Sequence, residues 1–145
     1  MGINEWIERE REGLRQQAHK AVQEFWRVHK GKVAKGEKAG YGVRAKRRGN
    51  GNGGVVIEWY RMRFSNKAGK WIARKESVPR HGGYRYTKRE LSRMEPWEWA
   101  AAVDVEDVAE QIRRQNEALT KIAYLTREYQ KRQATIDAKM GEEVE

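Results

Sequence analysis

The side chains that most often perform catalysis are few in this sequence, and their spacing assembles no catalytic site. The three histidines, His19, His29 and His81, include no helical pair with a glutamate between them, so a zinc-protease motif is absent. Two neighbouring histidines on a strand, the arrangement with which DNA-nicking relaxases hold a metal, are also missing. Without that metal site, Tyr41 and Tyr60 are disfavoured as nicking nucleophiles.

Carboxylates and glycines offer no better site. Glu58 and Glu76 lie on predicted strands, but residues 32–94 hold only four acidic side chains, too few for a metal-dependent nuclease. The glycine cluster GNGNGG at 49–54 lacks the lysine–serine ending of a phosphate-binding loop. The chain has no cysteine, which excludes disulfides, thiolate metal sites and thiol catalysis. We therefore expect a protein that is not an enzyme and that holds no cofactor or metal.

Electrostatic attraction is the chemistry that the sequence does offer. The 145 residues carry a net charge of +10. Residues 1–31 hold six basic and five acidic side chains, residues 32–94 eighteen and four, and residues 95–145 seven and twelve. The basic excess therefore lies entirely in the middle third, and a field concentrated in this way attracts polyanions. The predicted partner is double-stranded DNA.

The candidate DNA-binding residues lie on the proposed sheet, at its hairpin tips and in the loop that follows it. A two-stranded ribbon fits the major groove, where arginine can read guanine and lysine can contact phosphate. The alternative is an antiparallel sheet with one solvated, charged face, which is common. The candidates are Arg44, Lys46, Arg48, Arg61, Arg63, Lys67, Lys70, Arg74, Lys75, Arg80 and Arg85.

Hydrophobic periodicity places these residues between helices. A seven-residue apolar spacing predicts a helix from about Asn4 to His29, ended by Gly31. Alternation predicts a strand from Tyr41, with Tyr41, Val43 and Ala45 on its apolar side, and 49–54 suits a hairpin tip. Strands follow over 55–64 and 71–78, joined by a turn of about five residues. Tyr60, Met62 and Phe64 are expected on the face toward a helix, and Trp59, Arg61 and Arg63 on a basic outer face.

The last third is predicted to be helical. Thr87 and Glu90 form a capping box for a short helix, KRELSRM, which stops before Pro96. One long helix then runs from Trp97 to about Lys139, followed by an acidic frayed tail at 140–145. Two series of residues spaced seven apart form a mainly apolar seam on this helix, and such a seam is predicted to pack against another helix. They are Val105, Ile112, Leu119 and Thr126, and Val108, Gln115, Ile122, Tyr129 and Ile136. The first helix is too short to cover the seam, so we expect self-association as a homodimer.

The predicted fold class is thus α+β: an N-terminal helix (1–31), a three-stranded antiparallel meander (41–78) and a helical part (87–139) in one domain, 1–145. Six tryptophans must form most of the core, because aliphatic residues are scarce. Trp59 or Trp71 could still serve binding. Tyr84 and Tyr86, with Arg80, His81 and Arg85, form either a loop that faces nucleic acid or a clamp onto the long helix. No apolar run approaches the ~18 residues of a membrane span, and we expect a cytoplasmic protein.

The segments EWYR (58–61) and GYRYTKRELSRMEPWEW (83–99) also carry a family resemblance. With the long helix that follows, they resemble MobI-type conjugative transfer proteins over about Val55 to Leu125. The glycine-rich tip and the first basic strand have no match in that resemblance. It implies an accessory DNA-processing role, in which the protein binds near the origin of transfer and assists a relaxase. It implies no catalytic residues.

Two other classes remain in competition with this reading. One is a helical interaction or structural protein, whose basic patch has only non-specific affinity for nucleic acid. The other is an enzyme of unrecognised type.

Overall fold

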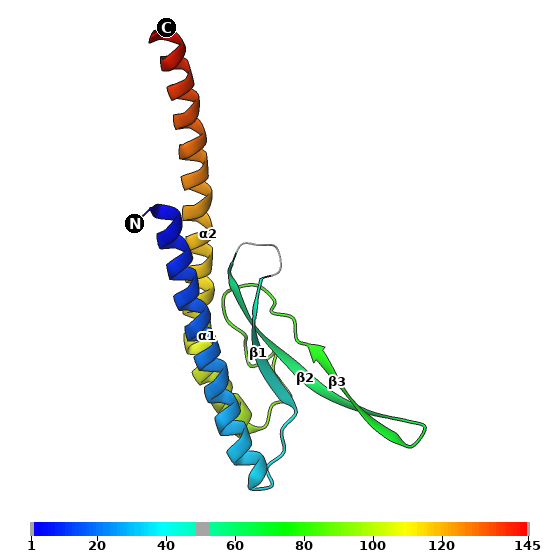
Figure 1. The fold of residues 1–145 in the computed structure, drawn as a ribbon. Coiled ribbons are helices and arrows are strands. Elements are labelled where there is room, and N and C mark those ends of the chain that lie inside the picture. The colour runs from blue at the N-terminus through cyan, green and yellow to red at the C-terminus, as the bar shows by residue number, and fades with distance from the viewer. Residues whose placement is uncertain (1, 49–52, 145) are drawn as a thin grey trace.

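Two long helices lie side by side, and a three-stranded antiparallel sheet packs against one side of the pair (Figure 1). The structure is a computed structural model that describes residues 2–48 and 53–144. It confirms the predicted α+β class with a single meander between two helices. The glycine-rich hairpin tip predicted at 49–54 falls mostly outside the described residues. In chain order the elements are α1 (Ile3–Ala34), β1 (Tyr41–Arg47), β2 (Val55–Lys67), β3 (Lys70–Ser77) and α2 (Pro96–Val144).

Helix α1 is longer at both ends than the sequence pattern predicts. It begins after Gly2 rather than at Asn4, and it continues through Gly31. A glycine inside a helix costs only about 1 kcal/mol relative to alanine, so Gly31 does not by itself end the helix. The helix ends where Gly36 adopts a φ of 84° and its N–H donates to the carbonyl of Val33. This left-handed glycine is the usual helix C-terminal cap.

Helix α2 also runs further than predicted. It begins at Pro96, and the Glu98 carboxylate accepts a hydrogen bond from the Glu95 N–H at 2.9 Å, as in a capping box. Its C-terminal end is Val144, so the segment predicted as a frayed tail continues the helix instead. Gly141 has no positive φ and therefore does not form the left-handed cap that ended α1.

The segment KRELSRM does not form the predicted short helix. The predicted capping contacts are present, because the Thr87 N–H donates to Glu90 Oε1 at 2.8 Å and the Glu90 N–H donates to Thr87 Oγ1 at 3.4 Å. They close only hydrogen-bonded turns over residues 88–93. The chain cannot continue as a helix because Glu95 precedes Pro96, and a residue before proline avoids helical geometry. Leu91, only 1% exposed, anchors the turns in the core.

The sheet has the predicted order, β1-β2-β3, with both pairs antiparallel. Strand β2 extends to Lys67, three residues beyond the predicted Phe64, and the turn to β3 is therefore tighter than predicted. Ala68 and Gly69 form this two-residue turn with φ angles of 53° and 78°. Two positive φ angles are typical of a type I′ hairpin turn, whose twist matches that of the strands.

The predicted assignment of the two faces of β2 is wrong in the half that packs on the helices. Trp59 is fully buried, and its ring meets that of Phe25 edge-on at 5.0 Å. Val43 lies opposite Trp59 in the register, so the apolar side of β1 and the Trp59 side of β2 form one surface. Tyr60 lies on the other face, above Gly42. The pairing register thus decides which face of β2 is buried.

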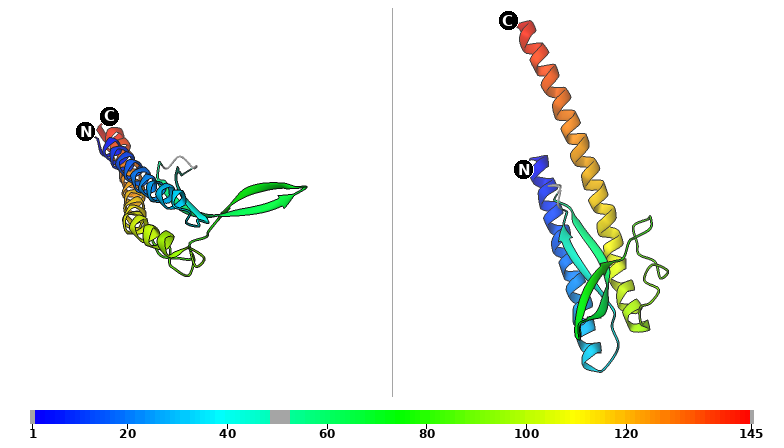
Figure 2. Two further views of the ribbon diagram at one scale, coloured as in Figure 1. Left: turned by 90° about the horizontal axis from the view of Figure 1, so that it is seen from below. Right: turned by 90° about the vertical axis from the view of Figure 1, so that its right-hand side faces the viewer.

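Beyond the end of β1, strands β2 and β3 continue as a two-stranded ribbon that we call the arm (residues 61–77). Figures 1 and 2 show it projecting away from both helices. Every residue of β3 is exposed, as are the last five residues of β2. The expectation that the whole meander packs on a helix is therefore wrong for this half. The core clusters around Phe25 and Trp59 and ends before the arm begins.

The two helices run antiparallel, and α1 covers only the first part of α2 (Figures 1 and 2). Val105, Ile112 and Leu119 of the predicted seam are buried in this contact. Leu119 is the last buried residue of α2 among those described, and we call the rest of the helix, residues 120–144, the overhang. The expectation that α1 leaves the far end of the seam exposed is confirmed. No helix in the described part of the chain is both long and apolar enough to cross a membrane.

The contact between Gly42 and Tyr60 gives a test of the sheet register. A Cβ added at Gly42 would lie 2.4 Å from the Tyr60 ring, whereas one added at Gly40 would meet nothing within 4 Å. We expect Gly42→Ala to lower the free energy of unfolding by about 1–3 kcal/mol through overpacking. Gly40→Ala, the matched control, should change it little. Urea unfolding of both variants measures the difference, and equal stabilities would contradict this register.

Candidate nucleic-acid interface

The arm carries five of the eleven predicted DNA-binding residues on one of its two faces. Residues directly opposite each other in an antiparallel pair share a face. Arg63 lies opposite Arg74, and Lys67 lies opposite Lys70 across the turn. Arg61 belongs to the same face at the base of the arm, where it lies opposite Glu76. Five cations therefore share this basic face with a single carboxylate, which pairs with Arg63.

The opposite face of the arm is apolar and solvent-exposed. Met62, Phe64 and Trp71 share it, and the exposed fractions of Phe64 and Trp71 are 62% and 72%. Lys75 also lies on this face, with its Nζ 4.9 Å from the centre of the Tyr60 ring. The alternation predicted from sequence thus holds in the arm, but no helix covers its apolar side. Of the two tryptophans singled out for binding, only Trp71 is accessible.

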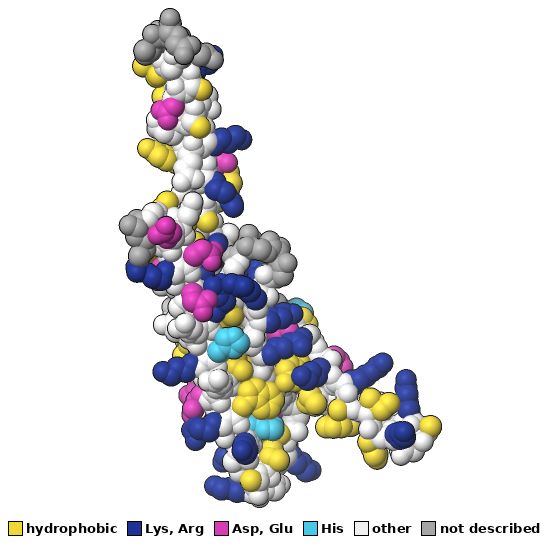
Figure 3. All heavy atoms as spheres, in the orientation of Figure 1, with side chains coloured by type: hydrophobic (Ala, Val, Ile, Leu, Met, Phe, Trp, Pro, Cys, Tyr) yellow, Lys and Arg dark blue, Asp and Glu magenta, His cyan; other side chains and the backbone are white. Residues whose placement is uncertain are grey.

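Figure 3 shows how these side chains lie on the surface. Basic side chains are spread along the arm, and hydrophobic ones follow its lower edge back to the body of the protein. Where the arm joins the body, Trp26, Tyr60, Met62 and Phe64 help to line a hollow of about 580 Å³. The arm is therefore amphipathic across its thickness, with a face suited to phosphates and a face suited to apolar groups.

Arg44 and Lys46 lie on the outer face of the sheet and share one carboxylate. Both form ion pairs with Glu58, the Lys46 Nζ at 3.1 Å. Partial burial acts to raise the pKa of Glu58, but the hydrogen bonds from Arg44 and Lys46 outweigh it and hold the pKa below its ordinary value. Glu58 therefore stays ionised and offsets part of the charge that these two cations would offer to DNA.

Arg48 and Arg80 lie away from the arm, on a polar hollow of about 480 Å³ beside α2. Arg113 and Asn116 of α2 also line it. Arg80 donates to the carbonyl of Gly83 within its own loop. These two predicted residues therefore form a separate basic spot, and the structure does not bring them together with the arm.

Arg85 is held against α2 by two acidic side chains. Its guanidinium lies 2.7 Å from Asp107 and 3.6 Å from Glu110. The hydrogen bond to Asp107 raises the pKa of Arg85 above its ordinary value. Arg85 is thus committed to the fold, and we remove it from the candidate interface.

The neighbouring tyrosines also clamp the loop onto the long helix. The Tyr84 hydroxyl donates to Glu117 at 2.5 Å, and Arg114 stacks on the Tyr84 ring at 4.4 Å. The hydrogen bond to Glu117 raises the pKa of Tyr84. Tyr86 is buried, and its hydroxyl donates to the Val78 carbonyl at 2.8 Å. Of the two alternatives for this loop, the structure supports the clamp.

Two buried carboxylates that the sequence reasoning missed hold the sheet on α2. Glu106, 1% exposed, accepts hydrogen bonds from Trp59 Nε1 at 3.1 Å and from the Tyr86 N–H at 2.7 Å, and it pairs with Arg113 at 2.8 Å. Glu98, also 1% exposed, accepts the N–H groups of Gly40 and Tyr41. Glu98 and Glu106 recur at helical spacing with Ala102 and Ala109 on the apolar side of α2. This spacing is the sequence signal from which their burial could have been predicted.

Within the described residues, no group of three acidic or histidine side chains is placed to hold a metal ion. The described residues thus form a pair of antiparallel helices that bears a three-stranded sheet, and the last two strands project from it as a basic ribbon. Residues 14–127 match the family model described as MobI protein, and this chain belongs to that family. The match includes α1 from Leu14 and all of β1, which the resemblance seen in the sequence did not reach. The family makes this a mobilisation-related protein. No curated protein and no solved structure matches the chain.

The buried Glu106–Arg113 pair can be tested through stability. Breaking a buried pair from one side leaves the other charge uncompensated, which costs about 3–5 kcal/mol. We expect Glu106→Gln to lower the free energy of unfolding by about that amount. Glu110→Gln is the matched control, because its pairs with Arg85 and Arg114 are at the surface and contribute about 0–1 kcal/mol. Thermal and urea unfolding compare the two, and equal losses would contradict the role given to Glu106.

Proposed function

We propose that this protein is a non-catalytic accessory protein of conjugative DNA transfer, which binds double-stranded DNA near the origin of transfer and assists a relaxase there. Membership of the MobI family supports the transfer process. The main structural support for DNA binding is the arm, a projecting ribbon with five cations on one face.

The geometry of the arm suits a DNA groove. A two-stranded ribbon can enter the major groove of B-DNA, where arginine contacts guanine edges. The arm extends clear of α2, whose acidic side chains would repel phosphate (Figure 3). In this proposal the tip residues Lys67 and Lys70 contact the phosphate backbone, and Arg61, Arg63 and Arg74, which lie nearer the body, face the bases.

The sheet residues Arg44 and Lys46 contribute less in this proposal, because Glu58 already pairs with both. Arg48 and Arg80 offer a second phosphate contact at the far side of the sheet. Lys75 lies on the apolar face of the arm and is not assigned a DNA contact. The interface proposed from the structure is therefore narrower than the one predicted from the sequence, with the arm at its centre.

Salt dependence tests the phosphate contacts. If about six phosphates are neutralised, log affinity for duplex DNA should fall with log salt concentration at a slope near −5. We expect Lys67→Gln with Lys70→Gln to weaken binding to a transfer-origin duplex and to a scrambled duplex alike, and to flatten the slope. The control removes two exposed cations at the C-terminal end of α1, Lys30→Gln with Lys35→Gln, and should leave both the affinity and the slope nearly unchanged. Gel-shift titrations at several salt concentrations measure these slopes.

Base contacts predict a different signature. Arg61→Gln or Arg63→Gln should cost about 1–3 kcal/mol on the transfer-origin duplex only, if the guanidinium reads a base edge there. The scrambled duplex supplies the comparison in the same titration. Unchanged DNA affinity after charge reversal at Arg44, Arg61 and Arg63, in a protein shown to be folded by circular dichroism, would move the binding surface elsewhere. The segment 80–93 would then be the next candidate.

A second candidate function is a helical interaction protein whose basic patch binds nucleic acid without specificity. The exposed overhang of α2 favours it, since Tyr129 and Ile136 are 68% and 53% exposed. The gel-shift titrations distinguish the two functions. If the affinities for the transfer-origin and scrambled duplexes are equal and are both lost at moderate salt, the second function is favoured.

A further inference from the structure

The two series of residues spaced seven apart on α2 differ in how far α1 buries them. Helix α1 buries the first series at Val105, Ile112 and Leu119. The second series runs beside it along the whole helix without a partner of its own. Val108, Tyr129 and Ile136 of this series are exposed, at 42%, 68% and 53%, and Ile122 is half-buried. A helix that leaves one apolar stripe uncovered over this length needs a second helix to pack against.

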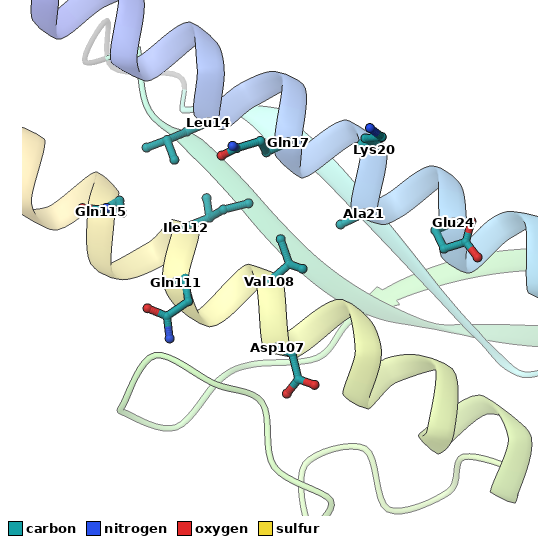
Figure 4. Close-up of a pocket in the computed structure, with 10 residues that line it drawn as sticks. All are labelled: Leu14, Gln17, Lys20, Ala21, Glu24, Asp107, Val108, Gln111, Ile112 and Gln115. Carbon is teal, nitrogen blue, oxygen red and sulfur yellow. The ribbon is translucent and has the colours of Figure 1, made fainter.

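The start of this stripe lies in a groove between the two helices. Leu14 and Ala21 of α1 and Val108 and Ile112 of α2 point toward one another across it, with the sheet behind the helices (Figure 4). The groove has a volume of about 650 Å³ and is mainly apolar. Polar side chains such as Lys20 and Asp107 stand at its edges (Figure 4).

The end of the stripe lies on the overhang, beyond the reach of α1. Leu125 and Met140, 63% and 55% exposed, accompany Tyr129 and Ile136 there. Each copy of the chain therefore presents two uncovered apolar surfaces on the same stripe. One is the groove between α1 and α2, and the other is the apolar side of the overhang.

We propose that a second copy of this chain covers both surfaces at once, as an antiparallel dimer in which the overhang of each copy lies in the groove of the other. A twofold axis near Ile122 satisfies this arrangement. It places Val108 opposite the partner's Ile136 and Gln115 opposite the partner's Tyr129. The interface is self-complementary, as a twofold dimer requires.

Charge along α2 selects the antiparallel orientation. Residues 96–120 hold six carboxylates and two arginines, whereas residues 121–141 hold five cations and two carboxylates. An antiparallel pair sets the basic overhang of one copy against the acidic first half of the other. A parallel pair would set like charges side by side.

The dimer has a consequence for DNA binding that rests on the proposed function. Each arm projects from the end of the helix pair that lies away from the overhang (Figure 1). A twofold axis at Ile122 then places the two arms at opposite ends of an elongated assembly. Two arms related by a twofold axis suit a DNA site with inverted half-sites.

The first test is the mass of the full chain in solution. Sedimentation equilibrium at tens of micromolar should give twice the mass of the chain. Ile136→Asp should yield a monomer at the same concentration, because the carboxylate would be buried in the groove. Ala134→Asp, on the opposite side of the overhang, is the matched control and should remain dimeric. Both positions are exposed in the single chain, so unchanged helicity by circular dichroism is expected. A monomeric wild-type chain would overturn the proposal.

The second test fixes the orientation. The chain has no cysteine, so introduced cysteines report only their own contacts. A mixture of the Val108→Cys and Ile136→Cys proteins should form the mixed disulfide on mild oxidation, and Ile122→Cys alone should form a disulfide with itself. Disulfides between two copies of Val108→Cys would instead indicate a parallel pair and contradict the proposal. Neither test involves DNA, so a dimer that fails to bind DNA would separate this inference from the proposed function.

Discussion

The buried carboxylate of Glu106 holds three parts of the fold together: the sheet, the loop between β3 and α2, and α2 itself. It bonds Trp59 of β2, the backbone of Tyr86 and the guanidinium of Arg113. Arg113 in turn donates to the carbonyls of Ile57 and Tyr84. A buried charge is tolerated only when all its partners are in place, so these elements can pack in a single relative position.

This constraint also determines where the sheet stops being part of the body. The core ends with Trp59 and its neighbours, and Glu98 holds the start of β1 by accepting two backbone N–H groups. Strands β2 and β3 extend past that point with only each other for support. The arm is therefore a ribbon with two accessible faces on a rigid base.

Of the two segments that carry the family resemblance, the longer one, 83–99, contributes more to the fold than to the proposed DNA interface. Tyr84, Arg85 and Tyr86 clamp the loop to α2, Leu91 fills the core, and Glu98 caps α2 while holding β1. Of the five cations on the basic face of the arm, none lies within 83–99, and only Arg61 lies in the other resembling segment, 58–61. The recognisable motif thus indicates which scaffold the chain builds, and that scaffold presents the arm.

The two long helices, the three strands, the order of the meander and the uneven distribution of charge could all be predicted from the sequence, because periodicity and local charge are properties of neighbouring residues. The alternation of Met62 and Phe64 with Arg61 and Arg63 was likewise readable from the chain. That Trp59 faces the core could be known only from the folded chain, because it follows from the pairing of Trp59 with Val43, sixteen positions earlier, in a register that no local pattern fixes. The fold also determines that Arg85 pairs with Asp107 and that Arg44 and Lys46 share Glu58. Long-range partners of this kind determine which cations remain available to a ligand, and they exist only once the chain has folded.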